Sequence, residues 1–234
     1  MNNFKDLGLN ESIVKSLTYK TPTEIQERSI PHLIRGEDFL GIAQTGTGKT
    51  AAFALPLIED TLKHSCKMEA CEVRFLIIAP TRELATQIDQ SIRAYSSSNS
   101  VTTAVAIGGV SKDLQVESLS KGCDFLTATP GRLLDLIRSK SVNFSKLQSL
   151  VLDEADMMLD YGFLEDVNEI VLSLPTKRQT IMFSATMPRT ISDLAQTILT
   201  NPKRVEIRPE STVAKKVSEK LYYVSEENKN FLLC

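Results

Sequence analysis

The sequence lacks any apolar run long enough to cross a bilayer, and it lacks a secretory signal. Its longest apolar stretch, residues 75–79, lies between Arg74 and Pro80, whereas a transmembrane helix needs about 20 apolar residues. The first six residues, MNNFKD, show no basic head in front of an apolar segment. These absences predict a cytoplasmic protein that has no membrane partner.

Cysteine and histidine are too few and too scattered to form a metal cage. The four cysteines stand at positions 66, 71, 123 and 234, which fit no zinc-binding spacing, and the chain has two histidines. We therefore expect reduced thiols of an intracellular protein. An excess of one charge is also missing, because 27 basic and 29 acidic residues leave a net charge of −2. Any contact with nucleic acid must then come from a local patch.

The chain does have the composition of a folded protein. Of its 234 residues, 42% are hydrophobic and 24% are charged, which is ordinary for a globule and excludes a disordered chain. At about 150 residues per domain, the length corresponds to one large domain, or to one domain and the start of a second.

Short β-branched runs alternate with segments of helical periodicity along most of the chain. Several of the runs are apolar at consecutive positions, as expected for strands that are covered on both faces. The pattern predicts an α/β fold with a mostly parallel sheet and helices on both faces. Ligands are expected at the carboxyl ends of its strands. The predicted strands are about seven: 39–43, 74–79, 102–107, 124–128, 149–153, 180–184 and 204–207.

Residues 43–50, AQTGTGKT, form a P-loop in which Ala43 replaces the usual first glycine. In such a loop the backbone N–H groups surround phosphates, the lysine contacts the β and γ oxygens and a hydroxyl binds Mg²⁺. Lys49 and Thr50 are the candidates for the last two roles. A glycine-rich turn without a ligand is the alternative, but the predicted strand before the loop and helix after it favour a phosphate site. The other loop residues are Thr45, Gly46, Thr47 and Gly48.

A second acidic motif, Asp153-Glu154-Ala155-Asp156, closes the predicted strand at 149–153. A carboxylate at the end of a strand near a P-loop is suited to hold Mg²⁺, partly through water, and we assign this role to Asp153. Glu154 is the candidate for orienting or deprotonating the attacking water. A solvated acidic turn is the alternative, and the P-loop upstream favours the catalytic interpretation.

Four further motifs follow predicted strands: PTREL at 80–84, the Gly108-Gly109 pair, TPGR at 129–132 and SAT at 184–186. Together with the P-loop and the acidic motif, this ordered set resembles the first core domain of a DEAD-box ATP-dependent RNA helicase of a bacterial type. The resemblance covers residues 4–234. It implies a RecA-like fold, the cofactors ATP and Mg²⁺, and RNA as a partner.

The segment YKTPTEIQ at 19–26 resembles the adenine-reading segment of that family, with Thr18 and Glu24 departing from the usual Gly and Pro. The resemblance implies that Gln26 reads the adenine edge, that Tyr19 stacks on the base and that Thr21 belongs to the same site. A glutamine amide offers the donor and the acceptor that match adenine. Thr23 and Gln26 also fit a helix capping box, which is the structural alternative, but the P-loop downstream favours adenine recognition by Gln26, and Thr23 can still cap the helix.

For RNA, the resemblance implies contacts to the sugar–phosphate backbone from five residues, which are Thr81, Arg82, Gly109, Thr129 and Arg132. Thr81 and Thr129 also stand at N-cap positions, where helix N–H groups face a phosphate, and capping alone is the alternative. Backbone contacts predict binding that is independent of sequence. Few aromatic residues lie near these motifs in the sequence, which argues against base stacking as the means of holding RNA.

The resemblance further implies that the hydroxyls of Ser184 and Thr186 hydrogen-bond Asp156 and so couple the nucleotide state to RNA binding. An ordinary strand–helix cap is the alternative for these hydroxyls.

Composition changes near residue 209, where periodicity stops. We expect an ATP-binding domain over 1–208, with the adenine segment at 4–30, a linker over 209–219 and the start of a second helicase domain over 220–234. The partner is then the protein's own C-terminal RecA-like domain, and we expect a monomer. An arginine finger from that domain is worth about 10³ to 10⁵ in turnover, so the chain alone should barely hydrolyse ATP.

The alternative functions are a non-catalytic module that holds ATP or RNA, and a DNA helicase of a related superfamily.

Overall fold

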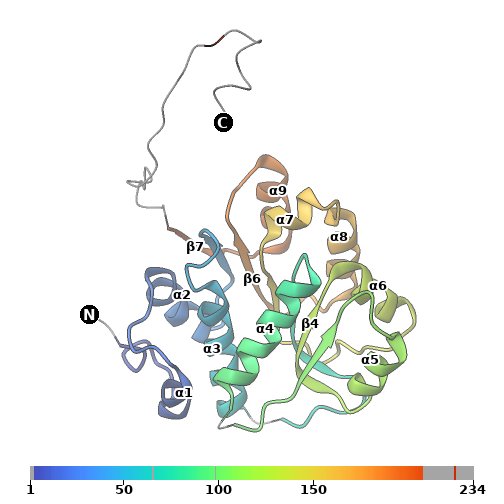
Figure 1. Cartoon of the computed structure of the whole chain (residues 1–234), viewed down its shortest axis with the longest axis horizontal. Helices are drawn as coiled ribbons and strands as arrows, with labels where there is room; N and C mark the ends of the chain where they lie inside the picture. The colour runs from blue at the N-terminus through green and yellow to red at the C-terminus, as the bar shows by residue number, and fades with distance from the viewer. Residues whose placement is uncertain (1–2, 65, 98, 208–223, 225–234) are drawn as a thin grey trace.

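The computed structural model describes residues 3–64, 66–97, 99–207 and 224, which form an open α/β fold (Figure 1). Every strand lies within one residue of its predicted range at both ends. The strands pair in parallel, in the order β3-β4-β2-β5-β6-β1-β7. The predicted fold class is therefore confirmed. The strands are β1 (Phe39–Ile42), β2 (Val73–Ile78), β3 (Thr103–Ala106), β4 (Cys123–Ala128), β5 (Ser149–Leu152), β6 (Gln179–Ser184) and β7 (Lys203–Glu206).

Several helices begin at capping signals that the sequence contains. The Asn10 side chain accepts a hydrogen bond from the Ser12 N–H at 2.9 Å, and the Thr81 hydroxyl accepts one from the Leu84 N–H at 3.1 Å. Pro130 takes the first helical position of its helix. The helices are α1 (Glu11–Ser16), α2 (Glu24–Ile34), α3 (Lys49–Lys63), α4 (Arg82–Tyr95), α5 (Lys112–Leu119), α6 (Pro130–Arg138), α7 (Ala155–Asp160), α8 (Leu164–Ser173) and α9 (Arg189–Ile198).

The helices cover both faces of the sheet and form two apolar cores. Helices α1 to α4 pack on one face and α5 to α9 on the other, which Figure 1 shows as its blue-to-green and its green-to-orange sides. Strand β2 serves both cores, because Phe75 and Ile77 point to one face while Leu76 and Ile78 point to the other. All six residues of β2 are buried, which explains the consecutive apolar positions.

The parallel order brings the predicted functional motifs to one edge. The P-loop follows β1, Thr81 follows β2, Thr129 follows β4, and Asp153 follows β5. Because the strands run in the same direction, their carboxyl ends meet at the same edge of the sheet.

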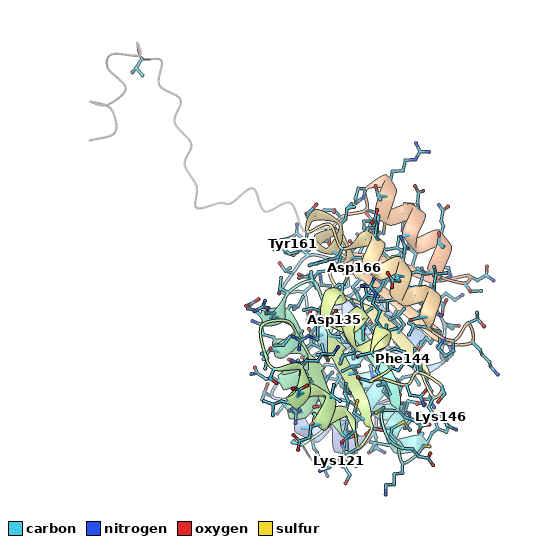
Figure 2. All side chains as sticks on the ribbon, turned by 90° about the vertical axis from the view of Figure 1, so that its right-hand side faces the viewer. Lys121, Asp135, Phe144, Lys146, Tyr161 and Asp166 are labelled. Atoms are coloured by element: carbon cyan, nitrogen blue, oxygen red, sulfur yellow. The ribbon has the colours of Figure 1, made fainter. Side chains whose placement is uncertain are left out.

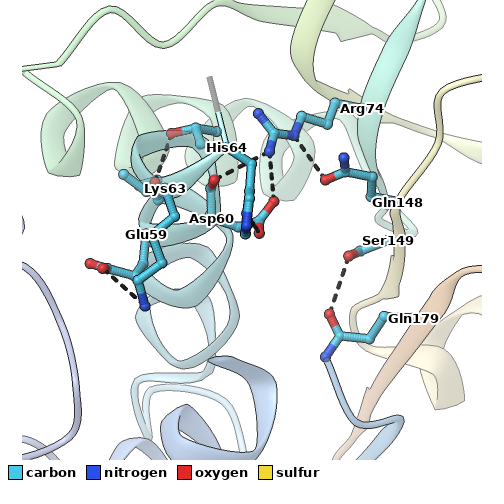
Figure 3. Close-up of polar contacts among 10 residues, drawn as sticks. Glu59, Asp60, Lys63, His64, Arg74, Gln148, Ser149 and Gln179 are labelled. Atoms are coloured by element: carbon cyan, nitrogen blue, oxygen red, sulfur yellow. Dashed lines mark hydrogen bonds and ion pairs between the residues drawn. The ribbon is translucent and has the colours of Figure 1, made fainter. Parts of the chain in front are cut away.

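The opposite, amino edge of the sheet holds a fully buried arginine. Arg74 of β2 is 1% exposed. Its Nη2 donates to Asp60 Oδ2 at 2.7 Å and its Nε to Gln148 Oε1 at 2.9 Å, so the charge is paired within the protein (Figure 3). This pairing ties the end of α3 to the starts of β2 and β5.

The predicted linker at 209–219 and the predicted second-domain start at 220–234 lie outside the described residues, apart from Val224. Among the residues described, no helix is both long enough and apolar enough to cross a membrane.

Candidate functional site

A cavity of about 710 Å³ opens at the carboxyl edge of the sheet, between the P-loop, the end of β5 and the segment before α2. Of the residues predicted to bind ATP or to catalyse, Thr47 does not line this cavity. Its hydroxyl donates to the Gln44 carbonyl at 2.8 Å. The others line this cavity together: Tyr19, Thr21, Gln26, Thr45, Gly46, Gly48, Lys49, Thr50, Asp153 and Glu154.

The P-loop has the backbone conformation that phosphate binding requires. Gly46 and Gly48 have φ values of 78° and 94°, which side chains other than glycine rarely adopt. A Cβ at Gly48 would in addition overlap the Gln26 amide. Gly48 is the N-cap of α3 and no side chain caps that helix, so its first N–H groups are available to an anion. Lys49 is 5% exposed, and its Nζ donates to the Ala43 carbonyl at 3.2 Å.

At the end of β5, the carboxyl group of Asp153 is buried and the backbone of Glu154 has an uncommon conformation. Asp153 is 2% exposed, and burial raises its pKa to about 6 although the Lys49 charge opposes the shift. Glu154 has a left-handed backbone with φ of 56°, which is uncommon outside glycine and typical of functional sites. Its N–H donates to Asp153 Oδ1 at 3.1 Å. Charge and backbone strain are thus concentrated at the cavity wall.

The cavity fits Mg²⁺ only in company with phosphate. Thr50 and Asp153 both line it and offer hard oxygen ligands, the kind that Mg²⁺ prefers. Within the described ranges, no cluster of three or more acidic, histidine or cysteine side chains could hold a metal ion by itself. A site with few protein ligands and substrate phosphates as the remaining ligands is the usual Mg²⁺ arrangement in nucleotide enzymes.

The segment before α2 forms the capping box that the sequence allows. The Thr23 N–H donates to Gln26 Oε1 at 2.9 Å, and Gln26 Nε2 donates to the Gly48 carbonyl at 3.1 Å. The Thr23 hydroxyl donates to the Thr47 carbonyl at 2.8 Å. These bonds attach α2 to the P-loop, yet the amide keeps one N–H and one lone pair. Adenine recognition by Gln26 therefore stays a prediction beside an observed structural role.

Tyr19 is held as a half-buried ring at the cavity wall. It packs edge-to-face on the fully buried Phe4, with ring centroids 5.6 Å apart. Its hydroxyl contacts the Tyr95 hydroxyl at 3.4 Å. Burial first, and then Tyr95, raise the pKa of Tyr19 well above its ordinary value. The ring is therefore neutral and fixed, as stacking on a base would require.

Sequence reasoning missed the contribution of α4 to this cavity. Glu83, Gln87, Ser91 and Tyr95 all line it. They are spaced by four residues and so share one face of α4. This four-residue spacing of side chains with polar atoms, which begins within the PTREL motif, is the sequence signal that could have identified them.

A second groove, of about 870 Å³, lies beside the first cavity. Thr81, Arg82, Thr129 and Arg132 line it. Gly109 lies against Arg82, because a Cβ there would overlap the guanidinium. The structure thus brings the five residues predicted to contact RNA to one place. Of the two predicted caps, the Thr81 hydroxyl caps α4 whereas the Thr129 side chain makes no capping bond to α6.

Of the three arginines that line the groove, Arg138 is paired with Glu169, whereas Arg82 and Arg132 are incompletely paired. Arg132 Nη2 donates to the Val110 carbonyl at 3.0 Å, while its Nη1 is buried and has no hydrogen-bond partner in the described part of the chain. The Arg82 guanidinium makes no hydrogen bond or ion pair with any described residue. A buried donor without a partner is costly, and the Arg82 guanidinium has donors from which a phosphate could accept hydrogen bonds.

The groove also contains aromatic rings, although few aromatic residues lie near the predicted RNA motifs in the sequence. Tyr161 and Phe163 line it. They come from the turn between α7 and α8, near Asp166 in the sequence but separated from the other groove residues by β5 and α7, so the fold brings them to the groove.

Asp156 joins α7 to the strand β6. Its Oδ2 accepts hydrogen bonds from the Thr186 N–H at 2.8 Å and hydroxyl at 2.9 Å. Its own N–H donates to Ser184 Oγ at 3.2 Å, and that hydroxyl donates to the Thr186 carbonyl at 2.7 Å. Burial alone would raise the pKa of Asp156, but these hydrogen bonds outweigh it and lower the pKa. The contact is in place, and its coupling role stays a prediction.

Comparison with known proteins gives the family context. Residues 23–194 match the family model of the DEAD/DEAH box helicases. The chain is 42% identical to the ATP-dependent RNA helicase DeaD of Buchnera aphidicola, over 94% of this chain and 36% of that protein. It is also 42% identical to the DEAD-box ATP-dependent RNA helicase RhpA of Helicobacter pylori, over 97% of this chain and 45% of that protein. The chain spans less than half of these relatives.

Solved structures agree with the fold. A DEAD box protein of Methanococcus jannaschii superposes with a TM-score of 0.81 at 33% identity, over 88% of this chain and 56% of that chain. A hypothetical ATP-dependent RNA helicase of Sulfolobus tokodaii gives 0.77 at 32% identity, over 85% and 57%. The predicted RecA-like fold is thereby confirmed. Because the family model matches residues 23–194, which is more than half of the chain, the chain belongs to the DEAD/DEAH box helicase family.

Proposed function

We propose that this chain binds ATP–Mg²⁺ in the first cavity and the RNA backbone in the second groove, as the N-terminal half of an RNA helicase. The observation that carries the proposal is that the two sites adjoin and share Thr81 and Glu83 in their walls. Helix α7 also joins them, because its N-cap residue Glu154 lines the first cavity and its C-cap residue Tyr161 lines the second groove. A nucleotide and an RNA bound side by side could therefore sense each other through one short helix.

In the nucleotide site, the N–H groups of the P-loop and the Lys49 ammonium hold the phosphates. Thr50, together with Asp153 partly through water, would hold Mg²⁺, which supplies positive charge against the phosphate oxygens. Glu154 orients or deprotonates the attacking water. Its position beside Asp153, at the N-terminus of α7, supports this role.

In the RNA site, Arg82 and Arg132 contact phosphates, and the N-termini of α4 and α6 add their N–H groups. Such contacts bind single strands with little regard to sequence. Asp156, with Ser184 and Thr186, would transmit the nucleotide state from the end of β5 to the end of β6.

The second RecA-like domain is part of the proposal. The coverage of 36% and 45% of the curated relatives supports it, because those proteins have room for a further domain. With its arginine finger that domain would raise turnover by about 10³ to 10⁵. We therefore expect this chain alone to bind ATP weakly and to hydrolyse it barely. Robust RNA-stimulated hydrolysis by the chain alone would contradict that part of the proposal.

The hydrolytic role is tested by Glu154→Gln in the full-length protein. We expect the variant to bind ATP and RNA together and to stall before hydrolysis, which filter binding and phosphate release would measure. Unchanged turnover would favour a non-catalytic binding module. Comparing single strands with and without 2′-hydroxyls would separate an RNA helicase from a DNA helicase.

A further inference from the structure

A large aromatic side chain lies exposed at the groove that holds Arg82 and Arg132. Tyr161 is 52% exposed and lines this groove. Figure 2 views this face and labels Tyr161 beside Asp166 and above Asp135, which line the same groove. Because about half of this side chain is in solvent, it contributes little to the core, and core packing alone does not explain its position.

The Tyr161 ring is braced from one side. It meets Phe163 edge-to-face, with centroids 6.3 Å apart and planes inclined by 65°. Phe163 is half-buried and packs against the core that lies under α6 and α8. Tyr161 is 52% exposed and lines the groove, so part of the residue stays accessible beside this contact. A platform of this kind, supported on one side and partly accessible, suits stacking by a planar group.

The backbone around Tyr161 is also fixed. The Tyr161 N–H donates to the Met157 carbonyl at 3.0 Å, and the Phe163 N–H donates to the Met158 carbonyl at 2.8 Å. Between them Gly162 turns the chain with φ of 76°, a value that glycine adopts without strain. Both rings are therefore attached to the end of α7, and little ordering remains to be done when a ligand binds.

Proteins that hold single strands combine cations for the backbone with aromatic rings for the bases. The groove contains both: Arg82 and Arg132 have unpaired donors, and Tyr161 supplies an aromatic side chain. We propose that Tyr161 stacks on a base of the single-stranded RNA whose backbone lies in this groove. The inference rests on the proposed function, and it adds a base contact to a site otherwise built for phosphates.

Stacking has a chemical signature that separates it from phosphate binding. Every base offers a π-face, so the contact is tolerant of sequence, but purines stack more strongly than pyrimidines. The affinity for a strand that keeps the sugar–phosphate backbone but lacks bases should not depend on Tyr161. Loss of Arg82 or Arg132 should weaken all strands alike.

The experiment measures fluorescence anisotropy of labelled oligo(A), oligo(U) and an abasic oligoribonucleotide of equal length, titrated at low salt with the 234-residue chain. For Tyr161→Ala we expect about fivefold to tenfold weaker binding of oligo(A). The loss should be smaller for oligo(U) and absent for the abasic strand. Tyr161→Phe, which keeps the ring, should bind like the unaltered chain. Leu172→Ala is the matched control, because Leu172 is 86% exposed on α8 and does not line the groove.

Each other result has a definite meaning. Equal losses for oligo(A) and the abasic strand would overturn stacking in favour of a structural role for Tyr161. Unchanged binding of oligo(A) by Tyr161→Ala would overturn it in favour of a different use of the ring, such as contact with the second domain. In both cases the proposed function survives if Arg82→Ala weakens all three strands. If the unaltered chain binds no strand, the proposed function and this inference fall together.

Discussion

The two edges of the sheet differ in how they treat a buried charge. At the amino edge, Arg74 is surrounded by protein acceptors (Figure 3). Its guanidinium also lies 5.1 Å from the centre of the Phe75 ring. At the carboxyl edge, Asp153 is buried beside a second acid, Glu154, and burial raises the pKa of Asp153. Each edge also has one buried arginine nitrogen without a partner among the described residues, Arg178 Nε at the amino edge and Arg132 Nη1 at the carboxyl edge. The contrast therefore lies between Arg74, whose charge joins elements of the fold, and Asp153, whose charge the fold compensates incompletely.

The same contrast appears within the acidic motif itself. Asp153 and Asp156 are both shielded from solvent, yet their pKa values shift in opposite directions. Burial dominates at Asp153, and the Lys49 charge does not compensate for it. Hydrogen bonds from Thr186 and Ala185 prevail at Asp156. The ionised form of Asp156 is thus stabilised by the protein's own hydrogen bonds, whereas that of Asp153 is not fully compensated within the protein.

The largest effect should come from breaking the amino edge. Arg74→Met removes the partner of Asp60 and Gln148, so we expect a loss of about 3 kcal/mol in the free energy of unfolding. Urea denaturation of the chain would measure it. Arg204→Ala is the control, because its ion pair with Glu206 is exposed and should contribute less than about 1 kcal/mol. If both variants lost the same small amount, Arg74 would not hold this edge together.

The next effect should come from the P-loop. Lys49→Ala removes a buried ammonium whose only protein acceptor among the described residues is a carbonyl. We expect ATP affinity to fall by about tenfold to 100-fold, the range of a charge-assisted hydrogen bond. Calorimetric titration would measure this fall. Lys63→Ala, on the same helix but at its other end, is the control and should bind ATP unchanged. An equal fall in both variants would point to damage to α3.

Much of the fold and of the candidate site could be predicted from the sequence. The strands, the P-loop and the order of the motifs depend on local patterns, and the structure confirms the strands to within one residue. The α4 stripe through Gln87 and Ser91 and the position of Tyr161 could not, because they depend on which elements the fold packs side by side. Gln26 shows the same limit, since its capping and its contact with the Gly48 carbonyl occur together. A short motif predicts a residue's candidate roles, and only packing shows which contacts it makes.

The two aspartates should respond to pH with opposite signs. The pKa of Asp153 is raised to about 6 from an ordinary 3.8, so its protonated form favours the folded state. That contribution is complete below the ordinary value and is lost as the pH rises through about 6. Asp153→Asn should therefore stabilise the chain at pH 7.5, by about 3 kcal/mol, and should have little effect near pH 4.

Asp156→Asn is the matched comparison for Asp153→Asn. The pKa of Asp156 is lowered, so its ionised form favours the folded state above the ordinary value, and this contribution is lost in acid. The variant should be destabilised at pH 7.5, and the difference from the unaltered chain should fade as the pH falls. Thermal unfolding in EDTA, without nucleotide, would measure both. Shifts of the same sign in the two variants would remove the contrast between the aspartates.

The smallest effect should appear in the salt dependence of RNA binding. If Arg132 contacts one phosphate, Arg132→Ala should lower the slope of log affinity against log salt by about 0.7, the value for a single strand. Its binding of different sequences should weaken uniformly. Arg178→Ala is the control, because Arg178 is at the amino edge, where its Nη1 donates to the Pro175 carbonyl. An unchanged slope for Arg132→Ala would mean that its buried, unpartnered donor serves no phosphate, and the contrast between the two edges would then rest on Arg74 and Asp153 alone.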